Sequence, residues 1–192
     1  MSEGRLYYVM GPSGAGKDSV LRWVRAYGVS HDVLCAHRYI TRPADAGGEN
    51  HVALSEAEFV SREHRGLFAL TWQAHGLHYG IGREIEHWLE RGAKVVVNGS
   101  RDAYLQAQER FPELQPVLIT ASREMMAKRL ALRGRETSED IAARLARSDA
   151  YQAPTGTLVI HNDGDLAEAG IALLGAITQP HRVDKMASSN KS

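Results

Sequence analysis

The residues whose types and spacing indicate chemistry most directly follow an apolar run at 6–10. They read Gly11-Pro12-Ser13-Gly14-Ala15-Gly16-Lys17-Asp18-Ser19. The first seven fit the phosphate-binding pattern of Gly, four residues, Gly and Lys. Such glycines let several backbone N–H groups point at phosphate oxygens, the helix that follows adds positive potential, and the Lys17 ammonium reaches the outer phosphates. Residues 11–19 therefore predict a binding site for a nucleoside triphosphate.

Asp18 stands where this pattern usually has Ser or Thr, whose hydroxyl binds Mg²⁺. One hypothesis is that the Asp18 carboxylate serves Mg²⁺, directly or through water, because the apolar run at 94–98 ends in the amide of Asn98 instead of an aspartate. The alternative is that Asp18 caps the start of the helix and that Ser19 serves the metal. The sequence leaves both interpretations open, with Asp18 and Ser19 as the candidate metal residues.

Arginines are the second chemical signal. They concentrate in one stretch as Arg133, Arg135, Arg144 and Arg147. Arg144 and Arg147 are three apart on a predicted helix at 138–151, so they share a face. Guanidinium groups match the oxygens of a transferring phosphoryl group, which predicts an arginine-rich lid over about 134–154. A solvated helix face paired with nearby acidic residues is the alternative, and the phosphate-binding loop favours the lid because phosphoryl transfer needs several cations.

Two further segments carry groups suited to an anionic acceptor. Arg38 and Arg42 are four apart and lead into a loop where Pro43 prevents a helix from continuing. The Tyr79 hydroxyl and Arg83 lie among flexible glycines at 76–83. Taken separately, both segments are weak signals.

The elements that must position these residues alternate between short apolar runs and helical patterns. Predicted strands are 6–10, 94–98, 116–120 and 157–161, and predicted helices are 17–27, 102–110, 123–133 and 166–177. Such alternation is typical of an α/β fold with a parallel sheet flanked by helices.

A long excursion at about 37–91 separates the first two of these strands. It has a capping box at 55–58 that starts a helix, and short strands are predicted near 68–72 and 78–81. We expect this insertion to carry an acceptor site that faces the phosphate-binding loop. Residues 179–192 have no periodicity and are predicted to be a disordered tail.

Composition limits the classes of protein that fit. The chain has 192 residues, enough for one domain, and 23 basic residues balance 23 acidic ones, so no global field favours nucleic acid or a membrane surface. The single cysteine, Cys35, excludes an internal disulfide and is expected in the core. No signal peptide or membrane span is visible. We expect a soluble cytoplasmic enzyme with small-molecule substrates; the sequence carries no signal for its oligomeric state.

In combination, these motifs resemble the guanylate kinase family in type and order over about residues 5–165. The matching segments are 11–17, 41–43, 54–59, 76–80 and 129–135. The resemblance implies a P-loop NTPase domain over 1–178 with an acceptor-binding insertion and a lid over ATP. It places Lys17 on the ATP phosphates and Arg42 and Tyr79 on the acceptor phosphate, with Arg133 and Arg144 on the lid side.

Several positions depart from the guanylate kinase pattern. Leu70 stands where that family has a carboxylate that reads guanine, and Ile81 stands where it has a hydroxyl. The remaining replacements of its polar residues are Asn98, Ser100, Asp45 and His51. Each unpaired polar group of a buried guanine would cost about 1–3 kcal/mol. We therefore expect poor binding of GMP.

Two segments resemble the ribose 1,5-bisphosphate phosphokinase branch of these enzymes: 16–19 and 98–101. This resemblance implies transfer of the ATP γ-phosphate to ribose 1,5-bisphosphate with Mg²⁺, giving 5-phosphoribosyl 1-diphosphate, a reaction that bacteria use in phosphonate breakdown. The candidate acceptor-binding arginines are Arg38, Arg42, Arg83 and Arg101. The alternatives are a guanylate kinase, a non-catalytic interaction domain of that fold, and a kinase for another phosphorylated sugar.

Overall fold

The computed structural model describes residues 4–134 and 136–179. Its central sheet has five parallel strands in the order β2-β7-β1-β8-β9. Their bounds are β1 Arg5–Met10, β2 Val33–Cys35, β7 Lys94–Asn98, β8 Gln115–Thr120 and β9 Leu158–His161. The inner strands are apolar along their length because helices cover both faces of a parallel sheet.

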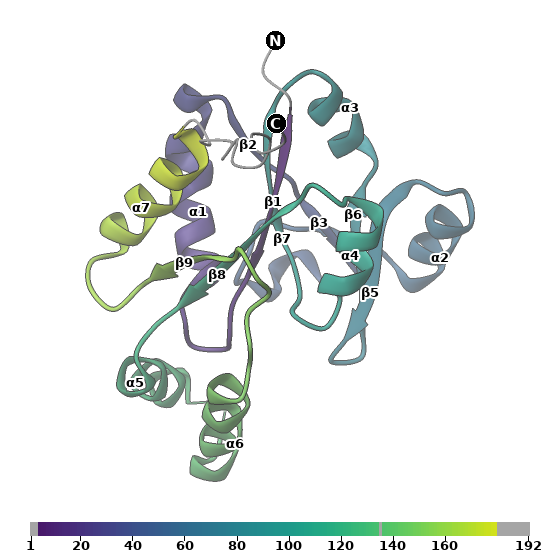
Figure 1. Ribbon diagram of the computed structural model, residues 1–192. Helices are drawn as coiled ribbons and strands as arrows, with labels where there is room; N and C mark the ends of the chain where they lie inside the picture. Colours follow the sequence, from purple (N-terminus) through teal and green to yellow (C-terminus); the bar gives the residue numbers. More distant parts are fainter. Residues whose placement is uncertain (1–3, 135, 180–192) are drawn as a thin grey trace, which may run out of the picture.

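Alternating side chains of β1 face two separate apolar cores. Tyr7 and Val9 pack with helices α1 (Lys17–Tyr27) and α7 (Leu166–Thr178), whereas Tyr8 packs on the opposite face. That opposite face is covered by α3 (Glu84–Glu90) and α4 (Tyr104–Arg110), as Figure 1 shows. The phosphate-binding loop leaves β1 between these two layers.

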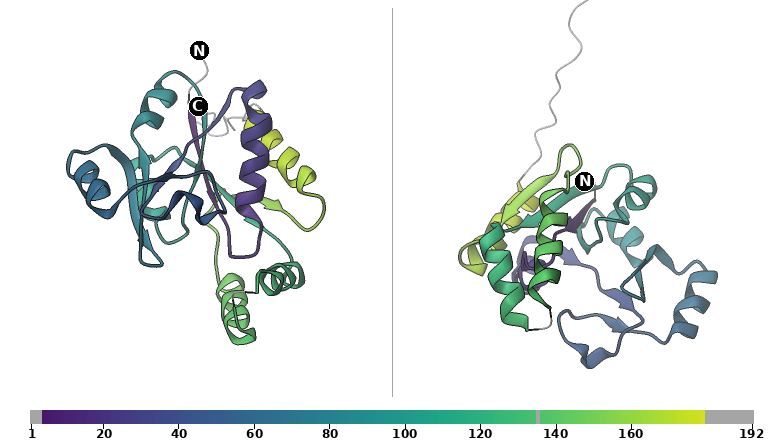
Figure 2. Two further views of the ribbon diagram at one scale, coloured as in Figure 1. Left: turned by 180° about the vertical axis from the view of Figure 1, so that it is seen from behind. Right: turned by 90° about the horizontal axis from the view of Figure 1, so that it is seen from below.

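A second sheet fills much of the predicted excursion at 37–91. Its order is β4-β3-β6-β5, with antiparallel β3–β6 and β5–β6 pairs. The bounds are β3 Arg38–Ile40, β4 Val52–Ala53, β5 Phe68–Ala74 and β6 Leu77–Gly82, with α2 at Glu56–His64 and short 3₁₀ turns at Gly28–His31 and Ala44–Ala46. Figures 1 and 2 show α2 and this sheet on the side of the molecule away from α1 and α7.

Helices α5 (Arg123–Arg133) and α6 (Ser138–Asp149) lie together at the end of the molecule where the phosphate-binding loop turns (Figure 1). Ser122 caps α5, and Thr137 and Asp140 form a reciprocal capping box on α6. On α5, Leu130 is fully buried and its side chain lies against Gly14 of the loop. The helix therefore supports the loop from one side.

The predicted strands and helices are confirmed with shifts of one or two residues at their ends. Sequence reasoning missed β2, β3, β4 and α3. The helix after Ser55 is confirmed, but only half of its expected capping box forms, because the Glu58 carboxylate accepts from Arg62 on the next turn. Of the predicted disordered tail, only Gln179, which ends α7, lies within the described residues. Over 4–134 and 136–179 no helix is long and apolar enough to cross a bilayer.

Leu130 and Leu132 form a matched pair on α5, since Leu130 is buried and Leu132 is 78% exposed. We expect Leu130→Ala to lower the free energy of unfolding by about 2–5 kcal/mol through lost burial and a residual cavity. Leu132→Ala should change it by less than about 0.5 kcal/mol. Urea denaturation of both variants measures the difference, and equal effects would contradict the packing described for α5.

Cys35, at the end of β2, packs against the core beside Arg25. Burial raises the pKa of its thiol, and the nearby Arg25 charge opposes this only in part. The reactive thiolate is therefore scarce near neutral pH. We expect iodoacetamide to alkylate Cys35 at least about tenfold more slowly in the folded protein than in urea, measured by mass spectrometry. Equal rates in the two states would show an accessible, activated thiol.

Candidate active site

The phosphate-binding loop connects β1 to α1, as the sequence pattern predicts. Gly14 and Gly16 have φ of +87° and +79°, a region that side chains other than glycine rarely adopt. A Cβ on Gly16 would also lie 2.4 Å from Nδ2 of Asn162. The loop therefore requires glycine at 16 for its backbone shape and for close approach of a neighbouring side chain.

Arg129 and Asn162 hold this loop from behind. The Arg129 guanidinium donates to the carbonyl oxygens of Gly14 and Ala15 at 3.4 and 3.3 Å, and to that of Asn162 at 2.8 Å. The Asn162 amide donates to the Ala15 carbonyl oxygen at 2.8 Å. Sequence reasoning did not assign either residue, because nothing local to them indicates a contact with a loop more than a hundred residues away.

Lys17 begins α1, and its ammonium donates to Oδ1 of Asn98 and contacts Oδ1 of Asp18 at 3.1 Å. Burial lowers the pKa of Lys17, and the Asp18 carboxylate offsets part of this effect. Burial alone would raise the pKa of Asp18, but the charge and hydrogen bond of Lys17, together with Arg38, hold it below its usual range. Each of the two side chains therefore favours the charged form of the other.

The two interpretations of Asp18 can be compared with its contacts. Within the described part of the chain its carboxylate binds Lys17 and accepts from Nδ2 of Asn98 at 3.1 Å. The N-cap residue of α1 is Gly16, and no side chain caps the helix. Ser19 lies exposed on the same turn, and its backbone N–H donates to the Gly16 carbonyl oxygen. The contacts of Asp18 thus fit an electrostatic role beside Lys17 better than helix capping.

Beside the loop lies a cleft of about 280 Å³, which we call the arginine cleft. It is lined by Gly11, Ser13, Arg38, Trp72, Ala74, His75, Tyr79, Gly99, Ser100, Arg101, Asp102, Arg144 and Arg147. Four guanidinium groups therefore face one carboxylate among its lining residues. Such an excess of forked cations suits an acceptor that carries more than one phosphate.

Both arginines predicted to share a face of α6 line this cleft. Arg144 donates to the Ser13 hydroxyl of the phosphate-binding loop at 3.0 Å and pairs with Glu136 at 3.2 Å. Arg101, from the loop after β7, lies over the Tyr151 ring at 4.7 Å. The cleft therefore brings together Arg144 and Arg147 from α6, Arg101 from the loop after β7, and Arg38 from β3 of the second sheet.

Arg38 and Tyr79 come from paired strands of the second sheet, β3 and β6. The Tyr79 ring stacks on Trp72 with centroids 5.5 Å apart, and the Arg38 guanidinium lies 5.0 Å from the Tyr79 centroid. Nε of Arg38 donates to Oε2 of Glu49 at 2.7 Å, and its Nη2 donates to the other oxygen. Trp72 both packs against the core and lines the cleft.

Tyr8 fixes the loop that carries Ser100 and Arg101. Its hydroxyl donates to the Ser100 carbonyl oxygen at 2.9 Å and accepts from the Ser100 N–H at 3.0 Å. Burial raises the pKa of Tyr8 to about 12, so the hydroxyl keeps its proton. A neutral buried phenol thus holds the end of β7 against the cleft.

Three of the arginines predicted at the site lie outside the lining of the cleft. Arg42 lines a separate hollow and contacts Nδ1 of His51 at 3.3 Å and Oε1 of Glu49 at 3.7 Å. Arg83 is turned toward Glu86, at 2.8 Å. Arg133 ends α5 with an exposed side chain. The structure therefore brings Arg38, Tyr79, Arg101 and Arg144 together, joins Arg42 to them only through Glu49, and leaves Arg83 and Arg133 apart.

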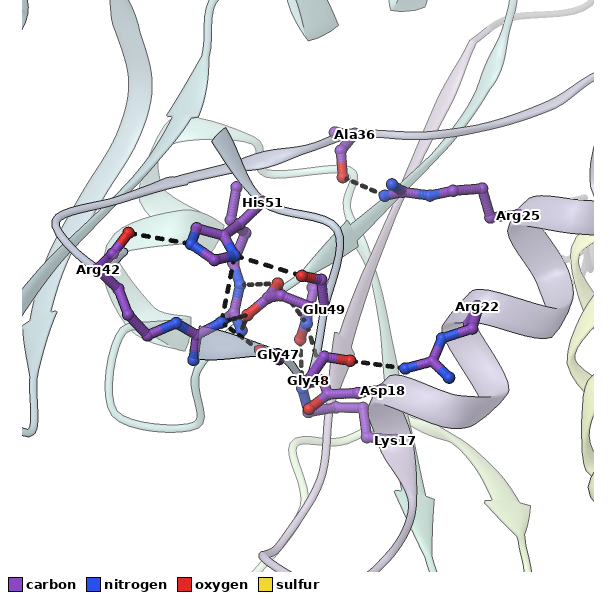
Figure 3. A network of polar contacts seen from close by, with 12 residues as sticks. Lys17, Asp18, Arg22, Arg25, Ala36, Arg42, Gly47, Gly48, Glu49 and His51 are labelled. Carbon is purple, nitrogen blue, oxygen red and sulfur yellow. Dashed lines mark hydrogen bonds and ion pairs between the residues drawn. The ribbon is translucent and has the colours of Figure 1, made fainter. Parts of the chain in front are cut away.

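Figure 3 shows Glu49 between Lys17 and Asp18 on one side and Arg42 and His51 on the other. Sequence reasoning assigned Glu49 no role, although this residue lies in the loop that follows Arg42. Leu70 on β5 and Ile81 on β6, two positions that depart from a guanine-reading site, have side chains buried in the apolar core. Neither offers a polar atom to a base.

Comparisons with known proteins agree with this geometry. No family model matches the chain. A guanylate kinase from Anaplasma phagocytophilum has the same fold, with a TM-score of 0.67 and 19% identity over 92% of this chain and 85% of that one.

Two relatives are named ribose 1,5-bisphosphate phosphokinase PhnN. The protein from Laribacter hongkongensis is 57% identical over 171 residues, and this chain spans 42% of its length. The protein from Chromobacterium violaceum is 56% identical over 180 residues, which cover 94% of this chain and 97% of the relative. Identity at this level over nearly the whole length shows that the chain belongs to the ribose 1,5-bisphosphate phosphokinase family.

Proposed function

We propose that this chain transfers the γ-phosphate of ATP to the 1-phosphate of ribose 1,5-bisphosphate, giving 5-phosphoribosyl 1-diphosphate and ADP. Its family membership and its arginine cleft support this proposal. On this proposal the chain serves phosphonate breakdown, with which the name of its relatives is compatible. The need for ATP and the free thiol of Cys35 support a cytoplasmic location.

The observation that carries the proposal is the composition of the arginine cleft. Four guanidinium groups line this cleft beside the phosphate-binding loop, whereas Leu70 and Ile81 are buried in the apolar core and do not line it. A purine would leave its polar edge unpaired there, and each buried unpaired group costs about 1–3 kcal/mol. A sugar bisphosphate needs no base-reading groups and brings the negative charge that the cleft lacks.

On this proposal, Lys17 and the backbone of residues 11–16 hold the ATP phosphates. Arg144 spans from α6 to Ser13, so it is placed to neutralise charge between donor and acceptor. Arg133, together with the segment at about 134–154, would act as a lid over the nucleotide. Arg38, Arg101 and Tyr79 would hold the acceptor.

Arg42 would join the acceptor phosphate after the two sheets approach each other. Its Nε is buried and has no hydrogen-bond partner among the described residues. A buried donor without a partner is unfavourable, and a phosphate oxygen would satisfy it. Arg83 is not needed for this arrangement.

The chemistry requires positioning and charge neutralisation more than proton transfer. The transferring phosphoryl group passes through a loose transition state, and the attacking phosphate oxygen is already ionised near neutral pH. Lys17, Arg144 and Arg38 would therefore contribute by fixed positive charge, which stabilises the transition state without reorganisation.

The site also fits Mg²⁺, which binds ATP phosphates and neutralises their charge. Over residues 4–134 and 136–179 no group of three or more His, Cys, Asp or Glu side chains forms a metal cage. Mg²⁺ commonly takes one or two carboxylates and completes its coordination with phosphates and water. The Asp18 carboxylate beside Lys17 suits this role, and Ser19 on the same turn is the alternative.

Product analysis with labelled ATP and a panel of acceptors tests the proposed reaction. We expect transfer of label to ribose 1,5-bisphosphate to be at least about a hundredfold faster than to GMP, since two or more unpaired polar groups would weaken GMP binding. Ribose 5-phosphate serves as the acceptor that lacks a 1-phosphate. Faster labelling of GMP would overturn the proposal, and faster labelling of another sugar phosphate would replace the acceptor.

The role of Asp18 is tested by the Mg²⁺ dependence of turnover in Asp18→Ser. If Asp18 serves the metal, we expect the Mg²⁺ concentration for half-maximal rate to rise about tenfold or more, because a carboxylate ligand is lost. Ser19→Ala is the matched variant and should leave that concentration within about twofold. The opposite pattern would assign the metal to Ser19.

A further inference from the structure

Glu49 has the most concentrated set of charged contacts near the site, and the proposed mechanism gives it no role. The side chains of Glu49 and Arg38 are each only 12% exposed. The Glu49 carboxylate also lies 3.7 Å from Nη2 of Arg42 and accepts from Nδ2 of Asn98 at 3.3 Å. One side chain thus joins β3, the loop after it, and the end of β7 in the central sheet.

A carboxylate so close to a site for anions repels the acceptor, so its presence needs a compensating role. Glu49 lines a second cavity of about 320 Å³ with Asp18 and Asn98, and it is not among the residues that line the arginine cleft. Its partner Arg38 does line the cleft. Glu49 therefore reaches the acceptor through Arg38.

The geometry of the pair shows what that role is. Glu49 occupies Nε and Nη2 of Arg38, the two nitrogens along one edge of the guanidinium. Among the described residues the remaining nitrogen, Nη1, has no hydrogen-bond partner, which leaves it for an anion in the cleft. A guanidinium held along one edge loses little further freedom when it binds a phosphate.

We propose that Glu49 is a positioning residue that orients Arg38 toward the acceptor phosphates. The inference rests on the proposed function only in that the acceptor is a phosphorylated molecule. An alternative is that Glu49 is a placeholder, which occupies the arginines until an acceptor phosphate displaces it. The two roles predict opposite effects on acceptor binding when the charge of Glu49 is removed.

Glu49→Gln keeps the length of the side chain and removes its charge. If Glu49 orients Arg38, kcat/KM for the acceptor should fall about 10- to 100-fold, mostly through KM, because a bidentate charge-assisted pair is lost. KM for ATP should change less than about twofold. A lower acceptor KM in Glu49→Gln would instead establish the placeholder role and overturn the proposal.

A double-mutant cycle with Arg38→Gln separates positioning from a general effect on folding. If Glu49 acts through Arg38, adding Glu49→Gln to Arg38→Gln should lower kcat/KM by less than about twofold. An effect of the same size in both backgrounds would overturn the proposal. If Glu49→Gln does not fold, Glu49→Asp takes its place, since its shorter side chain cannot span Arg38 and Asn98 together and the same non-additivity is expected.

Glu86→Gln is the matched control. Glu86 also pairs with two arginines, Arg83 and Arg110, but lies away from the cleft, so kcat/KM for the acceptor should stay within about twofold. Should the wild type prefer an acceptor other than ribose 1,5-bisphosphate, the same variants are measured with that acceptor. The proposed function would then be wrong, while the role of Glu49 would still be decided by the cycle.

Discussion

The site depends on the side-chain amide of Asn98, which is both an acceptor and a donor. Its oxygen accepts from the buried Lys17 ammonium, and its nitrogen donates to Asp18 and to Glu49. An aspartate at this position would place three carboxylates together and would remove the amide hydrogens that Asp18 and Glu49 accept. The amide at position 98 thus allows an aspartate, Asp18, to follow the phosphate-binding lysine. A negative charge remains beside Lys17, but it lies at the start of α1 instead of at the end of β7.

Repulsion between like charges also limits how the arginines can be arranged, since cations gathered without partners would repel one another. In this structure Glu49 holds Arg38, the Tyr151 ring lies under Arg101, and Glu136 pairs with Arg144. These three cations are thereby held before a substrate arrives. Fixed charges stabilise a transferring phosphoryl group more effectively than mobile ones because they need no reorganisation during the reaction.

Features set by local pattern were predictable, and features set by distant contacts were not. The loop at 11–17 and the strand at 94–98 follow from residue types in one short window. By contrast, β3 and β4 have three and two residues, and pairing with neighbours decides whether such short runs form strands at all. Arg129 and Glu49 escaped assignment for the same reason, because their partners lie on other elements. Arg83, predicted at the acceptor, is instead turned toward Glu86 on the next helix.

Two apolar positions of the second sheet help to explain how a fold shared with guanylate kinase accommodates a different class of acceptor. Leu70 on β5 and Ile81 on β6 pack with Ala36 and Tyr8 in the core and do not line the arginine cleft, so these positions contribute stability and no recognition. Recognition must then come from the guanidinium groups that line the cleft. Such charges respond to the number and spacing of phosphates, whereas buried carboxylates and hydroxyls would read a base. Selectivity in this chain therefore depends on how rigidly each arginine is held, and that rigidity comes from side chains outside the cleft.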